Sequence, residues 1–241
     1  MVVLLTDFGH SEYVGVMKGV IYGIAREAKV VDLCHTIAPQ NVTEGSWVLK
    51  NSYKYFPEGT VFCCVVDPGV GTQRKAIAVK TDKYRFVAPD NGLLWETVKE
   101  QRVIDMRQIP LPADASRTFH GRDVFARVAA AIELGDFERL GSKTGRVERL
   151  EFYKKGTEGI VVRIDGFGNV VTNLGRQDKD KYSVRTGRKR YAMEFYPDYS
   201  SAKERELFLI EGSSNTLEIS LKNGNANARL RLQAGARIEI S

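Results

Sequence analysis

Histidine and cysteine are scarce in this chain of 241 residues, which has three of each. Cys34, Cys63 and Cys64 are odd in number and lie in apolar, strand-like runs, a pattern typical of core thiols in a reducing compartment. Cys63 and Cys64 are neighbours on a predicted strand and should face opposite sides of the sheet, which argues against a shared metal or a nucleophilic pair. No two histidines have the spacing of a zinc or iron site, so we expect no metal.

Long hydrophobic runs are also absent. The N-terminal stretch MVVLLTDFG lacks a basic segment, its apolar run stops at Thr6, and no later run is long enough to cross a membrane. We therefore expect a soluble, cytoplasmic protein. The net charge of +6 comes from 36 basic and 30 acidic residues spread along the chain. No DNA- or RNA-binding motif accompanies this charge, so the sequence predicts no nucleic-acid partner.

Two parts of the chain differ in their pattern. From residue 1 to about residue 150, short apolar runs alternate with helical patterns, which predicts an α/β domain with a largely parallel central sheet. The helical patterns lie at 12–26, 43–55, 92–100 and 123–134. From about residue 157 to 241, the apolar runs are short, several alternate strictly with polar residues, and no convincing helix intervenes. This pattern predicts a smaller all-β, barrel-like domain, with 229–233 as one of its strands.

The first predicted helix carries Gly15, Gly19 and Gly23 at intervals of four, which places the three glycines on one face. In a membrane this spacing would favour helix pairing, but the charged residues of the same helix argue against a membrane span. We therefore expect the glycine face to pack closely against the sheet.

The stretch from Val61 to Lys80 holds one acid and one arginine in the loop between two apolar runs. Asp67 closes the first run and Arg74 opens the second. If the two strands pair as a hairpin, the guanidinium lies beside the acid and favours its charged form. A surface ion pair in an ordinary Asp-Pro-Gly turn explains the same residues. A phosphate-binding P-loop does not, because the loop lacks a Gly-Lys-Ser/Thr ending and leads into a strand.

Acidic residues follow several of the predicted strands. Asp7, Asp67 and Asp90 all fall at strand ends, and ligands of α/β sheets gather beyond the carboxyl ends of the strands. His120 comes directly before a predicted helix, where a lone histidine is most often a capping or packing residue. These positions make the strand ends the first place to look for a site.

Six motifs occur in order along nearly the entire chain: TDFG near the start, VDLCHTIAP, the DPGVG loop with a trailing Arg, APDNGLL, TFHGRD and DGFGNVVTN. Together they resemble the S-adenosyl-L-methionine hydroxide adenosyltransferases, relatives of the fluorinating and chlorinating enzymes. The resemblance implies that water, activated as hydroxide, attacks the ribose C5′ of S-adenosyl-L-methionine and releases adenosine and L-methionine. It also implies a homotrimer with sites between neighbouring subunits, and no cofactor besides the substrate.

The resemblance assigns roles to individual residues. Asp67, Arg74 and His120 correspond to the family's triad, and we hypothesise that Asp67 and His120 orient the water and accept its proton while Arg74 favours the hydroxide. Asp7 resembles the carboxylate that binds the ribose hydroxyls. The other implied substrate contacts are Glu12, Gln40 and Gly121 in the first domain, Asp165, Phe167 and Asn169 at the adenine and amino-acid end, and Ser213 and Ser214 at the methionine carboxylate. Halogenating relatives carry Trp at Gln40, and relatives carry Arg at Ser214.

Three functions from different classes stay open at this point. Hydrolysis of S-adenosyl-L-methionine is favoured, because halogenating relatives carry Tyr where Asp67 stands; attack by chloride or fluoride is the runner-up chemistry. A non-catalytic module that binds adenosine or S-adenosyl-L-methionine is the second class. A metal-dependent phosphohydrolase that uses Asp7, His10, Asp67 and Asp90 is the third.

Overall fold

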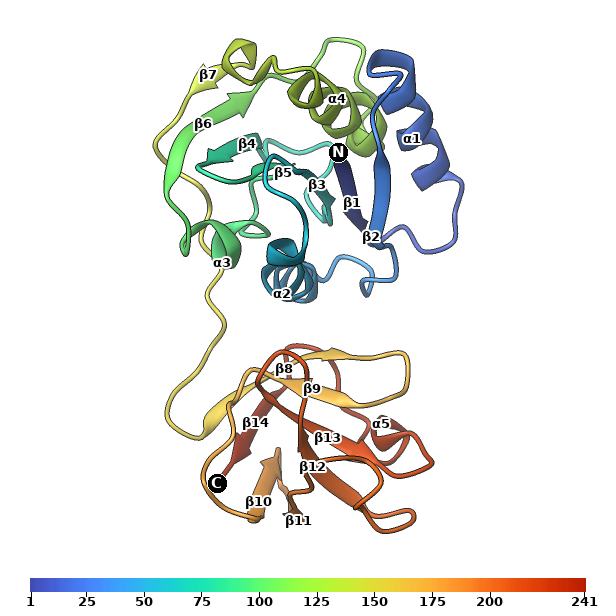
Figure 1. Ribbon diagram of the computed structural model, residues 1–241, viewed down its shortest axis with the longest axis vertical. Coiled ribbons are helices and arrows are strands. Elements are labelled where there is room, and N and C mark those ends of the chain that lie inside the picture. Colours follow the sequence, from blue (N-terminus) through green and yellow to red (C-terminus); the bar gives the residue numbers. More distant parts are fainter. The chain divides into compact units, whose positions relative to one another are not determined.

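The structure is a computed structural model that describes residues 1–241 (Figure 1). The chain divides into two compact units, Met1–Glu151 and Phe152–Ser241. The first unit contains a seven-stranded sheet with the order β2-β1-β3-β5-β4-β6-β7. Its strands are β1 (Val2–Thr6), β2 (Val30–Cys34), β3 (Val61–Val65), β4 (Ala76–Thr81), β5 (Arg85–Pro89), β6 (Val103–Ile109) and β7 (Ser142–Lys143).

This sheet is mixed. Strands β2, β1, β3 and β5 run parallel, whereas β4 is antiparallel to both β5 and β6, and β6 is antiparallel to β7. The predicted parallel arrangement therefore holds for one half of the sheet. The other half turns antiparallel because β4 and β5 are joined by a tight turn, and a connection this short can only link antiparallel strands.

Helices cover both faces of the sheet (Figure 1). They are α1 (Tyr13–Ile24), α2 (Val42–Ser52), α3 (Trp95–Val98) and α4 (Arg127–Glu133), with a π-helical turn at Gly121–Ala126 that leads directly into α4 and 3-10 turns at Tyr53–Tyr55 and Phe137–Arg139. The core on the α1 and α4 side contains Cys63, and the core on the α2 and α3 side contains Cys64. The prediction that these two thiols face opposite sides is confirmed, and burial raises the pKa of both.

The predicted hairpin of Val61–Lys80 was wrong. Strand β5 lies between β3 and β4, so the two strands are not neighbours. The β4–β5 connection is short, so closing it costs little entropy, and the other edge of β5 pairs with β3 in parallel. The loop between Asp67 and Arg74 therefore bridges over the end of β5.

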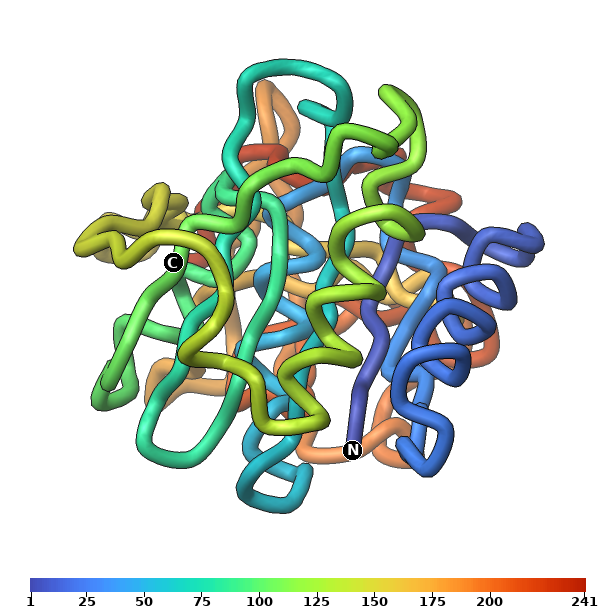
Figure 2. Tube along the Cα trace, turned by 90° about the horizontal axis from the view of Figure 1, so that it is seen from above, coloured from blue at the N-terminus to red at the C-terminus, as the bar shows by residue number.

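The glycine face of α1 was also misplaced. The buried residues of α1 are Val14, Met17 and Ile21, whereas Gly15, Gly19 and Gly23 are exposed. Apart from the neighbouring residues and backbone of the helix itself, no atom lies within 4 Å of a Cβ built on any of these glycines. Burial of the large apolar side chains removes more apolar surface from water than burial of glycine would, so the large side chains face the core. Figure 2 shows α1, in blue, at the edge of its unit beside α4. No helix anywhere in the chain has the length and apolar character that a membrane crossing requires.

The second unit is a nearly closed antiparallel barrel. Its strands follow the order β11-β10-β14-β8-β9-β13-β12, and a bridge between Phe195 and Leu209 brings the two ends of the sheet together. The strands are β8 (Glu158–Ile164), β9 (Val170–Thr172), β10 (Lys181–Thr186), β11 (Lys189–Glu194), β12 (Leu207–Glu211), β13 (Leu217–Leu221) and β14 (Arg237–Ile240). The predicted strand at 229–233 was wrong. The short helix α5 (Ala226–Leu230) forms there, since the Asn225 side chain accepts from the Ala228 N–H and caps it.

Candidate active site

Asp67 and Arg74 meet beyond the carboxyl end of β3. Arg74 Nε donates to Asp67 Oδ1 at 3.0 Å, and Arg74 Nη2 donates to Oδ2, which makes a two-point ion pair. The exposed fractions of the two side chains are only 7% and 6%, so this is not the surface ion pair that the sequence left open. The connecting loop requires Gly71, because its φ is +75° and a Cβ there would lie 2.4 Å from the Arg117 carbonyl oxygen.

His120 completes the cluster. Its Nδ1 lies 3.1 Å from Arg74 Nη2. Because a guanidinium can only donate, Nδ1 must accept, and the neutral ring then carries its proton on Nε2. Burial lowers the pKa of His120 and the charge of Arg74 lowers it further, while Asp67 and Asp123 oppose these effects. The structure therefore brings Asp67, Arg74 and His120 together as one contiguous set, with a neutral imidazole.

The segment that carries His120 is held by Asp123. The Asp123 carboxylate accepts from the Ser116 backbone N–H at 2.9 Å and from Arg122 Nε at 2.6 Å. The bond from Arg122 is the main reason that the pKa of Asp123 falls to about 2. The π-helical turn begins directly after His120, and such turns are frequent at functional sites. Asp123 thus stays ionised and fixes the approach of this segment to Arg74.

Asp7 follows β1 at the same edge of the sheet. Its Oδ2 accepts from the Gln40 backbone N–H at 2.7 Å. Burial raises the pKa of Asp7, the Gln40 amide opposes this, and the charge of Asp67 adds to the rise. A carboxylate accepts several hydrogen bonds, so Asp7 retains lone pairs for a ligand hydroxyl.

Gln40 contributes its backbone to this arrangement. Its φ is +63°, a left-handed conformation that a non-glycine residue adopts at a cost of about 1–2 kcal/mol. If this site binds adenosine, as the resemblance implies, we predict that Gln40→Gly keeps that affinity within about threefold of the wild type, because the N–H that meets Asp7 is unchanged. Isothermal calorimetry measures this affinity. A loss of about tenfold or more would instead assign the contact to the Gln40 side chain.

A cavity of about 300 Å³ opens over Asp7, Asp67 and His120. The rings of Phe8, Tyr13 and Phe119 form one wall, with the Tyr13 and Phe119 centroids 4.9 Å apart. Gly121 lines the same cavity, and a Cβ there would lie 3.1 to 3.2 Å from Phe119, Met17 and Phe8, so only glycine fits without displacement.

Several lining residues were missed at the sequence level. They are Phe8, Tyr13, Pro39, Val65, Val70, Thr118 and Phe119. Two of them could have been found from the motifs, since Phe8 belongs to TDFG and Phe119 belongs to TFHGRD. Tyr13 carried no such signal, because it opens α1 and its place depends on how the helix packs. Glu12 is exposed just before α1 and does not line the cavity, so its role stays a prediction.

The implied substrate contacts of the second unit lie on two hairpin turns. Between β8 and β9, Asp165 Oδ1 accepts from the Phe167 and Asn169 backbone N–H groups at 2.9 and 2.8 Å, and Asn169 Nδ2 donates to Asp165 Oδ2. This hydrogen-bonded turn presents Phe167 with 81% of its surface exposed. Ser213 and Ser214 lie in the turn between β12 and β13. Both turns offer accessible groups to a ligand, and the assignments to adenine and methionine stay predictions.

Asp90 points elsewhere. It lines a separate groove of about 870 Å³ with Trp95 and the segment 145–149, and its Oδ1 accepts from the Glu148 backbone N–H at 2.7 Å. No three His, Cys, Asp or Glu side chains of the chain are arranged to hold a metal ion. The four residues of the phosphohydrolase alternative are therefore not assembled as a metal centre.

The chain combines two kinds of unit. An α/β unit carries an Asp–Arg–His cluster at its strand ends, and a small β-barrel unit follows it, which together define a class of two-domain proteins. Models of the N- and C-terminal domains of S-adenosyl-L-methionine hydroxide adenosyltransferases match residues 2–141 and 159–239. The chain belongs to this family, as the six motifs predicted.

Comparison with individual relatives supports the family assignment. The chain is 34% identical to an (R)-S-adenosyl-L-methionine hydrolase from Thermus thermophilus, over 99% of this chain and 98% of the relative. It is 28% identical to a fluorinase from Nocardia brasiliensis, over 78% of this chain and 76% of that enzyme. A crystal structure of an uncharacterized conserved protein from Thermotoga maritima superposes with a TM-score of 0.91 at 38% identity and covers 100% of both chains.

Proposed function

We propose that this protein is an enzyme that hydrolyses S-adenosyl-L-methionine to adenosine and L-methionine. The observation that carries the proposal is the buried Asp67–Arg74–His120 cluster beneath a cavity, in a chain that belongs to this family. Two relatives named as hydrolases match 99% and 100% of the chain at 34% identity, whereas the named fluorinase matches 78% of it at 28% identity.

The reaction is a displacement at the ribose C5′. A water oxygen forms the new bond to C5′, the C5′–S bond breaks with its electron pair going to sulfur, and one water proton is lost. A sulfonium leaves without protonation, so catalysis consists of positioning the water and accepting its proton. Because Arg74 donates to His120 Nδ1, the ring offers an Nε2–H to the water oxygen. Proton acceptance then falls to Asp67, in place of the shared role that the sequence predicted.

The other site residues hold the substrate. Asp7 accepts from the ribose hydroxyls, and the cavity wall of Phe8, Tyr13 and Phe119 packs against the nucleoside. In the second unit, the Asp165–Asn169 turn and Ser213–Ser214 contact the adenine and the amino-acid end of the substrate. No step is assigned to a metal or a cofactor.

Incubation with S-adenosyl-L-methionine in ¹⁸O-labelled water tests the proposal. We expect adenosine that carries one heavy oxygen, and unlabelled methionine, in a reaction that survives a chelator. Binding of adenosine without turnover would support the non-catalytic module. A 5′-halogenated nucleoside formed faster than adenosine in chloride or fluoride would support the halogenating alternative. Loss of activity in the chelator would reject the metal-independent reaction.

The neutral state of His120 predicts a pH dependence of hydrolysis. A histidine pKa below the ordinary value of about 6.5 means that kcat should be constant above neutral pH and should fall only at more acidic pH. Protonation would place an Nδ1–H against the Arg74 guanidinium and break the cluster. Rates measured from pH 4.5 to 8.5 check this, and His120→Gln should lack the same acid limb. A limb centred above pH 6.5 would contradict the assignment.

We also propose a homotrimer with sites at the subunit interfaces, in a cytoplasmic location that suits three free thiols. The exposed glycine face of α1 supports association, since Gly19 has no atom within 4 Å of a built Cβ and stands beside exposed Val16 and Tyr22. We predict that Gly19→Gln yields folded monomers in analytical ultracentrifugation, while the equally open Gly145→Gln stays trimeric. If the wild-type protein is monomeric and fully active, the proposed homotrimer is rejected.

A further inference from the structure

The histidine of VDLCHTIAP has no role in the proposed reaction, yet it lies next to the Asp7 loop. We propose that His35 is a positioning residue that fixes the backbone on which Asp7 stands. The proposal rests on the assignment of Asp7 to ribose binding in the proposed function. It concerns how Asp7 is held, since His35 itself does not line the cavity.

The two backbone N–H groups that follow Asp7 are both held through His35. The Gly9 N–H donates to the His35 carbonyl oxygen at 2.7 Å. The Phe8 N–H donates to Thr6 Oγ1 at 3.2 Å, and this hydroxyl lies 2.9 Å from His35 Nδ1. One link therefore uses the backbone of His35 and the other uses its ring, with the fully buried Thr6 as intermediary.

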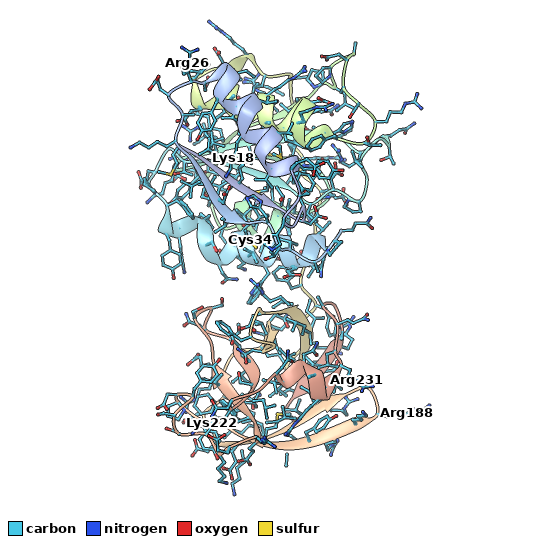
Figure 3. The ribbon with its side chains drawn as sticks, turned by 90° about the vertical axis from the view of Figure 1, so that its right-hand side faces the viewer. Lys18, Arg26, Cys34, Arg188, Lys222 and Arg231 are labelled. Atoms are coloured by element: carbon cyan, nitrogen blue, oxygen red, sulfur yellow. The ribbon has the colours of Figure 1, made fainter.

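The opposite side of the ring is anchored by charge. His35 Nε2 lies 2.9 Å from Asp32 Oδ1, and Lys18 Nζ lies 2.6 Å from Asp32 Oδ2. A carboxylate on this side favours the ring proton on Nε2, which leaves Nδ1 to accept from the Thr6 hydroxyl. Figure 3 labels Lys18 on α1 and Cys34 at the end of β2, the two elements that supply these groups.

A β-bulge makes this geometry possible. Leu4 pairs with Asp32 but Leu5 pairs with Cys34, so Leu33 is an extra residue in β2. In a regular strand, residues three apart point to opposite faces. The extra residue instead turns His35 towards Thr6 and onto the same side as Asp32, and bulges often re-aim side chains next to active sites.

Three variants test the proposal in the full-length protein. His35→Leu and Thr6→Val remove the side-chain link but leave the Gly9 bond, whereas His35→Asn keeps an acceptor near the Nδ1 position. We expect amide hydrogen exchange in residues 6–10 to become at least tenfold faster in the first two variants and to stay near wild type in His35→Asn. The KM for S-adenosyl-L-methionine should rise about tenfold in the same two, with kcat within about threefold. The control is His10→Leu, because His10 is exposed and has no hydrogen bond or ion pair.

The exchange measurement separates this proposal from the proposed function. If the wild type does not hydrolyse S-adenosyl-L-methionine, the function fails, and exchange at residues 6–10 still decides the positioning role. Unchanged exchange in both His35→Leu and Thr6→Val would overturn it. So would His35→Asn behaving like His35→Leu, because the ring would then act through its bulk alone.

Discussion

Asp67→Asn is expected to lower kcat for S-adenosyl-L-methionine hydrolysis about 10³-fold, within the range for removal of a general base. The amide has nearly the shape of the carboxylate and still accepts one bond from Arg74. It cannot take the proton of the attacking water, a role that the proposed mechanism assigns to Asp67 because His120 Nδ1 accepts from Arg74. KM should change by less than about threefold, since the lost interaction belongs to the transition state. Steady-state assays that follow adenosine measure both constants.

The matched control for this variant is Asp105→Asn. Asp105 also accepts from an arginine Nε, that of Arg107, at 2.9 Å, and both side chains are largely buried. It lies on β6, outside the cavity. The control should retain kcat within about twofold. If Asp67→Asn turns over at nearly the wild-type rate, Asp67 is not the proton acceptor and another group must take the proton.

Arg74→Met is expected to reduce the free energy of unfolding of the first unit by about 3–5 kcal/mol, because removal of one partner strands a buried charge. The substitution leaves Asp67, whose side chain is 6% exposed, without its two-point donor, and it removes the guanidinium 5.3 Å from the Phe125 ring. Urea denaturation followed by tryptophan fluorescence reports on this unit alone, since Trp47 and Trp95, the two tryptophans of the chain, both lie in Met1–Glu151.

A double variant separates the charge effect from lost packing. If the cost of Arg74→Met arises from an unpaired carboxylate, Asp67→Asn/Arg74→Met should be more stable than Arg74→Met, since the stranded charge is gone. Equal or lower stability of the double variant would assign the loss to the missing contact between the guanidinium and the Phe125 ring.

Element types could be predicted from local pattern, and strand neighbours could not. The apolar runs predicted the strands of both units except the two-residue β7, because period and composition act within a few residues. The hairpin of β3 and β4 was wrong because nothing in Val61–Lys80 reveals that β5 inserts between them. The segment 229–233 alternates like a strand, but the Asn225 cap overrides that pattern.

The glycine face of α1 shows a second limit. Spacing placed Gly15, Gly19 and Gly23 on one face correctly, yet it could not say which face the sheet would cover. That depends on the competing stripe of Val14, Met17 and Ile21, whose burial removes more apolar surface from water. The same reasoning explains why Tyr13 was missed as a cavity residue.

By itself, the sequence determined the family, the two-part architecture and the identities of the chemical groups, because motifs and periodicity are properties of consecutive residues. Only the tertiary structure decided that Arg74 donates to both Asp67 and His120, that Gln40 meets Asp7 through its backbone, and that the His35 ring meets the Thr6 hydroxyl beside Asp7. These contacts join residues far apart in the chain, and their geometry depends on strand order, a bulge and burial. Such features arise only when the whole sheet has formed.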